Sequence, residues 1–316
     1  MHKIKSFIRK LKAFDLVVVV FFIFLIIINI IFHSRVKYWI FFIITDLAII
    51  LFAFALGYFE EKYSNRFWRI IHYWYIAPLI LFTFKELYFM IHPIRVQDYD
   101  YLFIKIDHWL FGVNPTQWLQ QFTNPLLTEI LQIVYGSFYF LPIILALALL
   151  RNKRYFAVDF AVFSIVYGFF LSYLGYFALP GIGPRFTLHN FNLINVELPG
   201  LWLTNSLREL VDIGESIPAG VSNPAAIVQR DVFPSGHTMI TLIVIYLSIK
   251  LKSRSRYFLV PVGILLIFAT VYLWYHYVID LIGGIIFMIF SVWSGKYIFN
   301  WWQRKVGAKE FEYGKY

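Results

Sequence analysis

The sequence predicts an all-α integral membrane protein, a polytopic helical bundle of about eight transmembrane helices. Hydrophobic residues make up 60% of the 316 residues and charged residues only 15%, which excludes a soluble globular domain and a disordered chain. Aromatic residues make up 21%, as expected of lipid-facing helices with anchors at the membrane interfaces. The chain has no cysteine, so disulfides, thiolate metal sites and a cysteine nucleophile are excluded.

Eight apolar segments are long enough, at about 20 residues, to cross a bilayer. The first is too long for a signal peptide and lacks a small-residue cleavage site, so we expect a retained helix. Lys85 and Glu86 fall inside the third segment, where they form a structural pair or line a substrate groove. The segments are residues 13–32, 38–58, 70–91, 128–150, 155–179, 235–251, 257–274 and 278–299.

The distribution of lysine and arginine predicts that both termini are cytoplasmic. Cytoplasmic loops are enriched in these residues, and with the N-terminus inside, the inner segments hold 20 of the 28 and the outer connections 7. The net charge of +10 thus reflects topology and contact with a lipid bilayer, and no nucleic-acid partner is expected. We divide the chain into N-terminal transmembrane helices (1–92), a membrane core (93–300) and a cytoplasmic tail (301–316).

Two outer connections are long. Residues 106–112 predict a helix lying in the membrane interface, with Asp107 and His108 on its surface. Residues 180–234 contain five asparagines, six prolines and three leucines at helical spacing. A connection of this length is uncommon unless it is functional, so we expect a lid or a substrate-facing cap.

Three polar motifs lie at the outer ends of predicted spans. They are Pro180–Arg185, Arg230–His237 and His276–Asp280. Ionisable groups in or beside membrane helices are costly and indicate function. Although 91 residues separate Arg185 from His276, the topology places all three motifs at one membrane face, and we expect them to form one site.

These residue types suit phosphoester chemistry. His276 and Asp280 are four residues apart, so on a helix the carboxylate can hold one imidazole nitrogen and leave the other as nucleophile or base. Pro234, placed in a first helical turn, would expose backbone N–H groups that bind phosphate, and Arg185 can hold phosphate oxygens in a bidentate way. The structural alternatives are a stabilising His–Asp pair, a helix cap, and a zinc site of His237, His276 and Asp280, which the anion-binding surroundings disfavour.

The motifs resemble those of a known family. Phe233–His237 followed by His276–Asp280 resembles the second and third signature motifs of the type-2 phosphatidic acid phosphatase superfamily, and Gly183–Arg185 resembles the end of the first. The resemblance covers roughly residues 100–300.

The resemblance also implies roles for the site residues. His276 would be the nucleophile that forms a phosphohistidine, Asp280 would orient it, and His237 would protonate the leaving oxygen. Ser235, Gly236 and Arg185 would hold the phosphoryl oxygens. It implies no cofactor and no metal.

Two phosphate-binding cations of the family motifs are missing. Ala178 stands where the first motif carries a lysine, and Thr270 stands where the third carries an arginine. The stretch Ala269–Asp280 looks closer to the branch of inositol phosphorylceramide synthases and sphingomyelin synthases, which are phosphotransferases. Arg230 or Arg208 is the candidate replacement for the lost charge.

We therefore expect a membrane lipid phosphatase or phosphotransferase that acts through a phosphohistidine. The site would face the outer, periplasmic or luminal side of a cytoplasmic or inner membrane. An inositol phosphorylceramide synthase-like transfer to a lipid alcohol is the first alternative, and a non-enzymatic lipid transporter on the same scaffold is the second. Phosphatidate, phosphatidylglycerol phosphate, a polyprenyl diphosphate, a sphingolipid phosphate and a lipid A phosphate all fit as substrates, and the sequence predicts no oligomeric state.

Overall fold

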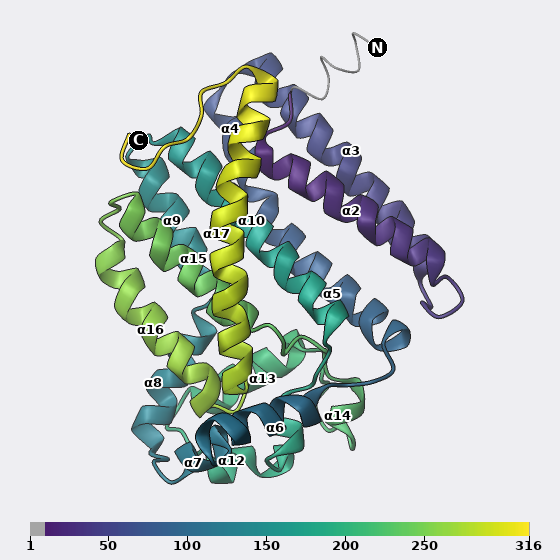
Figure 1. Ribbon diagram of the computed structural model, residues 1–316, viewed down its shortest axis with the longest axis vertical. Coiled ribbons are helices and arrows are strands. Elements are labelled where there is room, and N and C mark those ends of the chain that lie inside the picture. The colour runs from purple at the N-terminus through teal and green to yellow at the C-terminus, as the bar shows by residue number, and fades with distance from the viewer. Residues whose placement is uncertain (1–9, 316) are drawn as a thin grey trace. The chain divides into compact units, whose positions relative to one another are not determined.

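The computed structural model describes residues 10–315, which form helices and connections with no strand among them (Figure 1). The predicted all-α class is confirmed. The chain divides into two compact units, each assembled from segments far apart in the sequence. Unit 1 comprises Met1–Ile94, Leu149–Leu171 and Ile289–Tyr316, and unit 2 comprises Arg95–Ala148 and Ser172–Met288.

Unit 1 is built from long apolar helices. Antiparallel packing of α2 against α3 makes the largest helix–helix contact in it, and the rings of Phe21 and Phe170 stack at 4.1 Å between centroids. The helices are α2 (Ala13–Ile31), α3 (Trp39–Tyr63), α4 (Arg66–Trp74), α5 (Ile76–Ile94), the first part of α10 (Tyr155–Ala178) and the last part of α17 (Val278–Val306).

Several buried polar groups of unit 1 have partners from other helices, as apolar helices require of ionisable side chains. His72 Nε2 lies 3.0 Å from both carboxylate oxygens of Asp15, and its Nδ1 lies 2.6 Å from Oε2 of Glu60. Asn29 donates a hydrogen bond to Glu86 at 3.2 Å. The glutamate predicted inside the third span therefore contacts the first helix.

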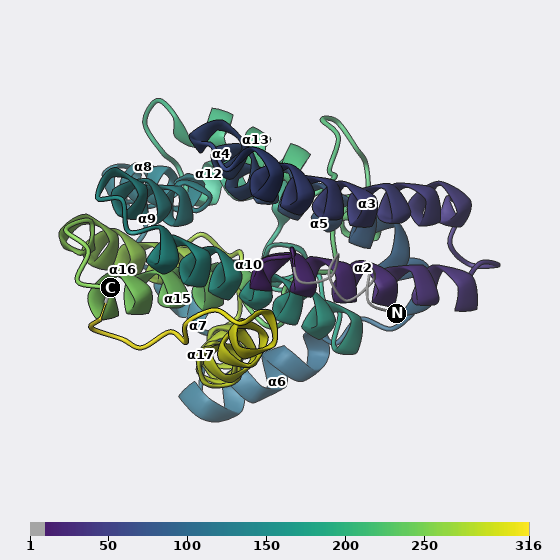
Figure 2. The ribbon, with the colours of Figure 1, turned by 90° about the horizontal axis from the view of Figure 1, so that it is seen from above.

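Unit 2 contains shorter helices and the long connection. The views from the front and from above agree that α15 and α16 lie side by side, and α16 also packs against α8 (Figures 1 and 2). The helices are α6 (Asp100–Phe111), α7 (Pro115–Gln120), α8 (Pro125–Gly136), most of α9 (Phe140–Arg151), the last part of α10, α11 (Pro184–Thr187), η1 (Phe191–Leu193), α12 (Ile194–Glu197), α13 (Thr204–Gly214), α14 (Pro224–Ile227), α15 (Gly236–Lys250), α16 (Arg256–Tyr272) and the first part of α17.

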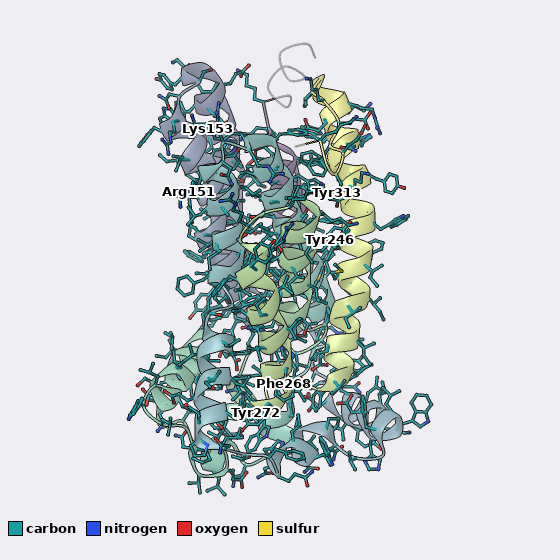
Figure 3. All side chains as sticks on the ribbon, turned by 90° about the vertical axis from the view of Figure 1, so that its left-hand side faces the viewer. Arg151, Lys153, Tyr246, Phe268, Tyr272 and Tyr313 are labelled. Atoms are coloured by element: carbon teal, nitrogen blue, oxygen red, sulfur yellow. The ribbon has the colours of Figure 1, made fainter. Side chains whose placement is uncertain are left out.

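The α8–α16 contact has a polar end. Phe268 and Tyr272 lie one turn apart on α16 (Figure 3), with ring centroids 6.0 Å apart. The Tyr272 hydroxyl accepts a hydrogen bond from the backbone N–H of Asn124 and lies 3.1 Å from the Thr128 hydroxyl. Asn124 also caps the N-terminus of α8 through its side-chain oxygen. These bonds set the start of α8, the helix that carries part of the site described below.

All eight predicted spans fall on helices. Five stretches are long and apolar enough to cross a membrane: α2, α3, α4 with α5, α10 and α17. The helices α8 and α9 meet the same criteria together but are bent by 56°, and α15 and α16 are apolar but shorter. The described residues thus hold five or six spans by length and composition, and the count of eight and the cytoplasmic termini stay predictions.

Two local expectations were wrong. Asp107 is buried, because its carboxylate accepts hydrogen bonds from the backbone N–H groups of Val278 and Ile279 at the start of α17, where a negative charge is favourable. Pro234 lies before the first turn of α15, because Ser235 is the N-cap of that helix. His108 is exposed, as expected.

Candidate active site

His276 and Asp280 form the centre of the site. They lie in the turn before α17 and in its first turn, with His276 Nδ1 3.4 Å from Asp280 Oδ2. The same oxygen accepts a hydrogen bond from the backbone N–H of Tyr277 at 2.8 Å. His276 is 5% exposed and Asp280 is fully buried. This geometry favours a proton on Nδ1 and leaves Nε2 as the basic nitrogen.

The imidazole of His276 is held neutral by its surroundings. Burial lowers its pKa well below the usual value, and nearby His237 and Arg185 act in the same direction. A hydrogen bond to the backbone of Val232 opposes them. A neutral imidazole keeps a lone pair for attack on an electrophile.

His237 faces His276 from the first turn of α15. The ring centroids of the two histidines are 5.7 Å apart, and the angle between the ring planes is 61°. Among the described residues, no hydrogen bond fixes the ring nitrogens of His237. Its orientation is set by two aromatic rings, since Tyr135 stacks on it at 4.6 Å and Phe138 lies at 4.3 Å.

Close packing of two glycines places the turn at residues 234–236. A Cβ atom on Gly175 of α10 would overlap the Pro234 ring, and one on Gly284 of α17 would lie 2.9 Å from the Ser235 carbonyl oxygen. Ser235 also donates its backbone N–H to the carbonyl of Asp280 at 3.0 Å. The turn is therefore tied directly to the helix that carries Asp280.

The start of α15 presents hydrogen-bond donors. The Ser235 hydroxyl oxygen caps the helix by accepting from the backbone N–H of Thr238 at 3.2 Å. No described residue accepts a hydrogen bond from the backbone N–H of Gly236 or His237. Such free groups at a helix N-terminus are suited to bind an anion beside the two histidines.

Arg185 is buried, with 3% of its surface exposed, and is already paired. Its Nη1 lies 2.9 Å from Asp212 Oδ1 and its Nη2 bonds to Glu215. Its guanidinium carbon lies 4.3 Å above the ring of Tyr275, which stacks on Tyr135 at 4.0 Å with an interplanar angle of 6°. A continuous stack therefore runs from Arg185 through the two tyrosines to the His237 ring.

The two arginines predicted to replace missing charge bind protein groups. Arg208 donates to Asn195 and to the carbonyl of Leu198, at 2.8 and 2.7 Å. Arg230 contacts Asp98 at 3.4 Å and donates to the carbonyl of Val228 at 2.6 Å. No hydrogen bond links either guanidinium to the histidines in the part of the chain that is described. Their phosphate-binding role stays a prediction.

A third arginine lies where the first motif lacks its lysine. Arg95 donates to the carbonyl of Ala178 at 3.0 Å. The other altered position, Thr270, is fully buried, and its carbonyl accepts the backbone N–H groups of Tyr275 and His276. Nothing in the sequence predicts this contact, because Arg95 and Ala178 are 83 residues apart.

Asp100 ties the first and third motifs together. Its carboxylate accepts the backbone N–H groups of Ile182 and Gly183 and the hydroxyl of Tyr277, at 2.8 to 3.2 Å. Burial raises its pKa, and these hydrogen bonds oppose the rise. Its role, like those of Tyr135, Asp212 and Glu215, gave no signal in the sequence, because each depends on a contact between distant segments.

The site residues lie within the segment of the chain that matches a known protein family. A family model described as the PAP2 superfamily matches residues 102–294, more than half of the chain and including Arg185, His237, His276 and Asp280. No curated protein and no solved structure matches the chain. The predicted superfamily is confirmed, whereas the resemblance to the inositol phosphorylceramide synthase branch stays a prediction. The match and the apolar helices support an integral membrane enzyme of the phosphatase or phosphotransferase kind.

Proposed function

The chain belongs to the PAP2 superfamily, and we propose that it cleaves a lipid phosphoester through a phosphohistidine on His276. The observation that carries this proposal is the arrangement of two facing imidazoles, one of which has its Nδ1 directed to a buried carboxylate. Asp280 orients the nucleophile and His237 serves as the acid. Donors for the phosphoryl oxygens come from Arg185, from the Ser235 hydroxyl and from the backbone N–H groups of Gly236 and His237.

The reaction has two steps. In the first, His276 Nε2 attacks phosphorus, the bond from phosphorus to the leaving oxygen breaks, and His237 donates a proton to that oxygen. In the second, His237 takes a proton from the acceptor, whose oxygen attacks phosphorus and breaks the bond to Nε2. Donors aimed at the phosphoryl oxygens stabilise the charge that develops in both steps.

The acceptor is water in the proposed phosphatase and a lipid alcohol in the transferase alternative. The two are separated by an assay of the purified protein in mixed micelles that follows free phosphate and new lipid products together. Donor lipids would include inositol- and choline-bearing phosphodiesters, and ceramide or diacylglycerol would be the alcohol. Release of phosphate or of the free phospho-headgroup, with the freed lipid alcohol as the only lipid product, identifies a phosphatase. A new headgroup-bearing lipid that requires the added alcohol identifies a synthase. Well-folded protein with neither activity would contradict the proposal and favour a transporter.

Tyr135→Ala should lower kcat by about 10²-fold, since small misplacements of a catalytic group have effects of this size. The stack on Tyr135 is what orients the His237 ring. Tyr135→Phe keeps the ring and should retain most of the activity. Steady-state kinetics with one lipid substrate measures both variants, and equal losses in both would show that the hydroxyl, not stacking, matters.

The acidic limb of the pH profile of kcat/KM should lie well below pH 6.5, the usual histidine pKa. His276 attacks in its neutral form, and its lowered pKa keeps that form populated to lower pH. Protonation would remove the lone pair only below the lowered pKa, so activity falls as pH falls through it. A pH-rate profile in micelles measures the limb, and a midpoint above 6.5 would contradict the assignment.

A further inference from the structure

Three consecutive apolar side chains are exposed in the connection that leads into α13. They belong to Leu201, Trp202 and Leu203, and Trp202 is 86% exposed. Apolar residues scattered singly over a surface are ordinary, whereas a contiguous apolar patch indicates contact with another protein or with a membrane. The surroundings of these residues indicate which of the two fits.

The backbone of this connection is held by one buried carboxylate. Glu129 of α8 is 5% exposed and accepts the backbone N–H groups of Leu201 and Leu203, at 2.9 and 2.7 Å. It also accepts the backbone N–H and the hydroxyl of Thr204, at 3.2 and 2.6 Å. Water can accept hydrogen bonds from a loop at an aqueous surface, whereas a loop that enters lipid needs partners within the protein. Glu129 therefore allows this backbone to leave water.

The helix α13 has polar side chains turned inward and apolar ones turned outward. Its buried residues are Thr204 and Arg208, whereas Leu210, Ile213 and the N-cap Leu203 are exposed. The three apolar residues are spaced seven and three positions apart, which places them on one face of the helix. A helix at an aqueous surface has the opposite arrangement, with its apolar stripe toward the protein. The outward face of α13 is that of a helix that lies in a membrane interface.

The helix on which α13 packs has a lipid-facing surface of its own. A Cβ atom on Gly136 of α8 would lie 3.7 Å from Leu207 of α13. On α8, Leu126, Ile130 and Ile133 are exposed at helical spacing. This helix belongs to the bent pair α8–α9, which is apolar enough to cross a membrane. The exposed face of α13 therefore adjoins a surface that faces lipid.

Exposed tryptophans occur on other helices at the same end of unit 2. Trp109 of α6 is 80% exposed, and Trp118 of α7 is also exposed. The helices α6, α7 and α13 lie at one end of the unit, with α6 and α13 on opposite sides of it when seen from above (Figures 1 and 2). Tryptophan is enriched at the level of the lipid headgroups. A belt of such residues around this end indicates a membrane, not a second protein, as the partner of Trp202.

We propose that residues 201–203 and the outward face of α13 insert into the membrane leaflet on the side of the candidate active site. The side chains enter the boundary between headgroups and acyl chains, while Glu129 satisfies the backbone behind them. Because Asp212 of the same helix bonds to Arg185, insertion fixes the position of a helix that contacts the site. The proposal does not depend on the reaction that the site catalyses.

The test uses the absence of cysteine from the chain, which allows one fluorophore to be attached at a chosen position. Trp202→Cys and Ile213→Cys place an NBD label on the proposed insertion surface. Glu209→Cys is the matched control, because Glu209 is an exposed polar residue of the same helix. The proteins are reconstituted in phosphatidylcholine nanodiscs, with or without bromine on the acyl chains, and those that elute as the wild-type protein does are measured.

Brominated chains should quench the labels at 202 and 213 at least about twofold more than the label at 209, because an interfacial helix buries its apolar face about 5–10 Å into the headgroup–acyl boundary. Aqueous iodide should quench in the reverse order. Equal quenching by iodide at all three positions would place the surface in water and overturn the proposal. Labels at 202 and 213 that neither agent quenches would mean that protein covers the surface, which would overturn it as well. No arm of the test measures catalysis, so failure of the proposed function would leave these results unchanged.

Discussion

His276→Ala should reduce turnover of every phospholipid substrate by at least about 10⁴-fold, because loss of a covalent nucleophile removes the pathway and leaves only positioning and charge stabilisation. The side chain is 5% exposed, and its hydrogen-bond partner Asp280 is fully buried. Phosphate release and lipid products in mixed micelles measure the loss. Rapid-quench trapping of the wild-type protein should also find an acid-labile, base-stable phosphoryl group on this residue.

The control for this variant is His108→Ala, which removes an exposed histidine of α6 and should keep full activity. Both variants should elute as the wild-type protein does in size-exclusion chromatography. A trapped phosphoryl group on His237 would reverse the roles of the two histidines. Full activity in His276→Ala would exclude the phosphohistidine mechanism.

Asp280→Asn should lower kcat by about 10⁴-fold, the effect expected when the group that sets an imidazole tautomer becomes an amide. The amide oxygen can still accept the backbone N–H of Tyr277, the contact that Asp280 Oδ2 makes. It can then no longer accept a hydrogen bond from Nδ1 of His276 with the strength of a carboxylate, nor stabilise the charged phosphohistidine. The turn should therefore keep its fold while the chemistry slows.

Measuring kcat and KM separately tests whether Asp280 acts on the chemical step or on substrate binding. Asp280 lies on the side of His276 away from the nucleophilic nitrogen, so KM should change by less than about threefold, a factor expected where ground-state contacts are kept. An unchanged kcat with a raised KM would instead mean that Asp280 contributes to binding. Circular dichroism and thermal unfolding of the purified variant would separate a chemical loss from a loss of fold.

The close approach of helices explains why the motif residues meet. The turn at 234–236 fits between α10 and α17 only because Gly175 and Gly284 have no side chain. Neither glycine stands out in the sequence, since both lie in apolar helices where glycine is ordinary. Their importance is visible only when the two helices and the turn are seen together.

Local sequence determines the fold class, one contact of the site and the family motifs. Composition and the lengths of apolar runs predict the helical membrane class, since burial in lipid demands long segments without charge. The i, i+4 spacing of His276 and Asp280 predicts their contact, although His276 lies in the turn before α17 and only Asp280 is on the helix. The family motifs follow from residues adjacent in the chain.

Only the tertiary structure decided how those pieces work together. Arg185 is engaged by Asp212 and Glu215, 27 and 30 residues away, and His237 is oriented by Tyr135 from another helix. Asp107 is buried as a cap of α17, 171 residues along the chain. Contacts of this kind depend on how helices pack and which polar groups then need partners, and neither composition nor periodicity carries that information.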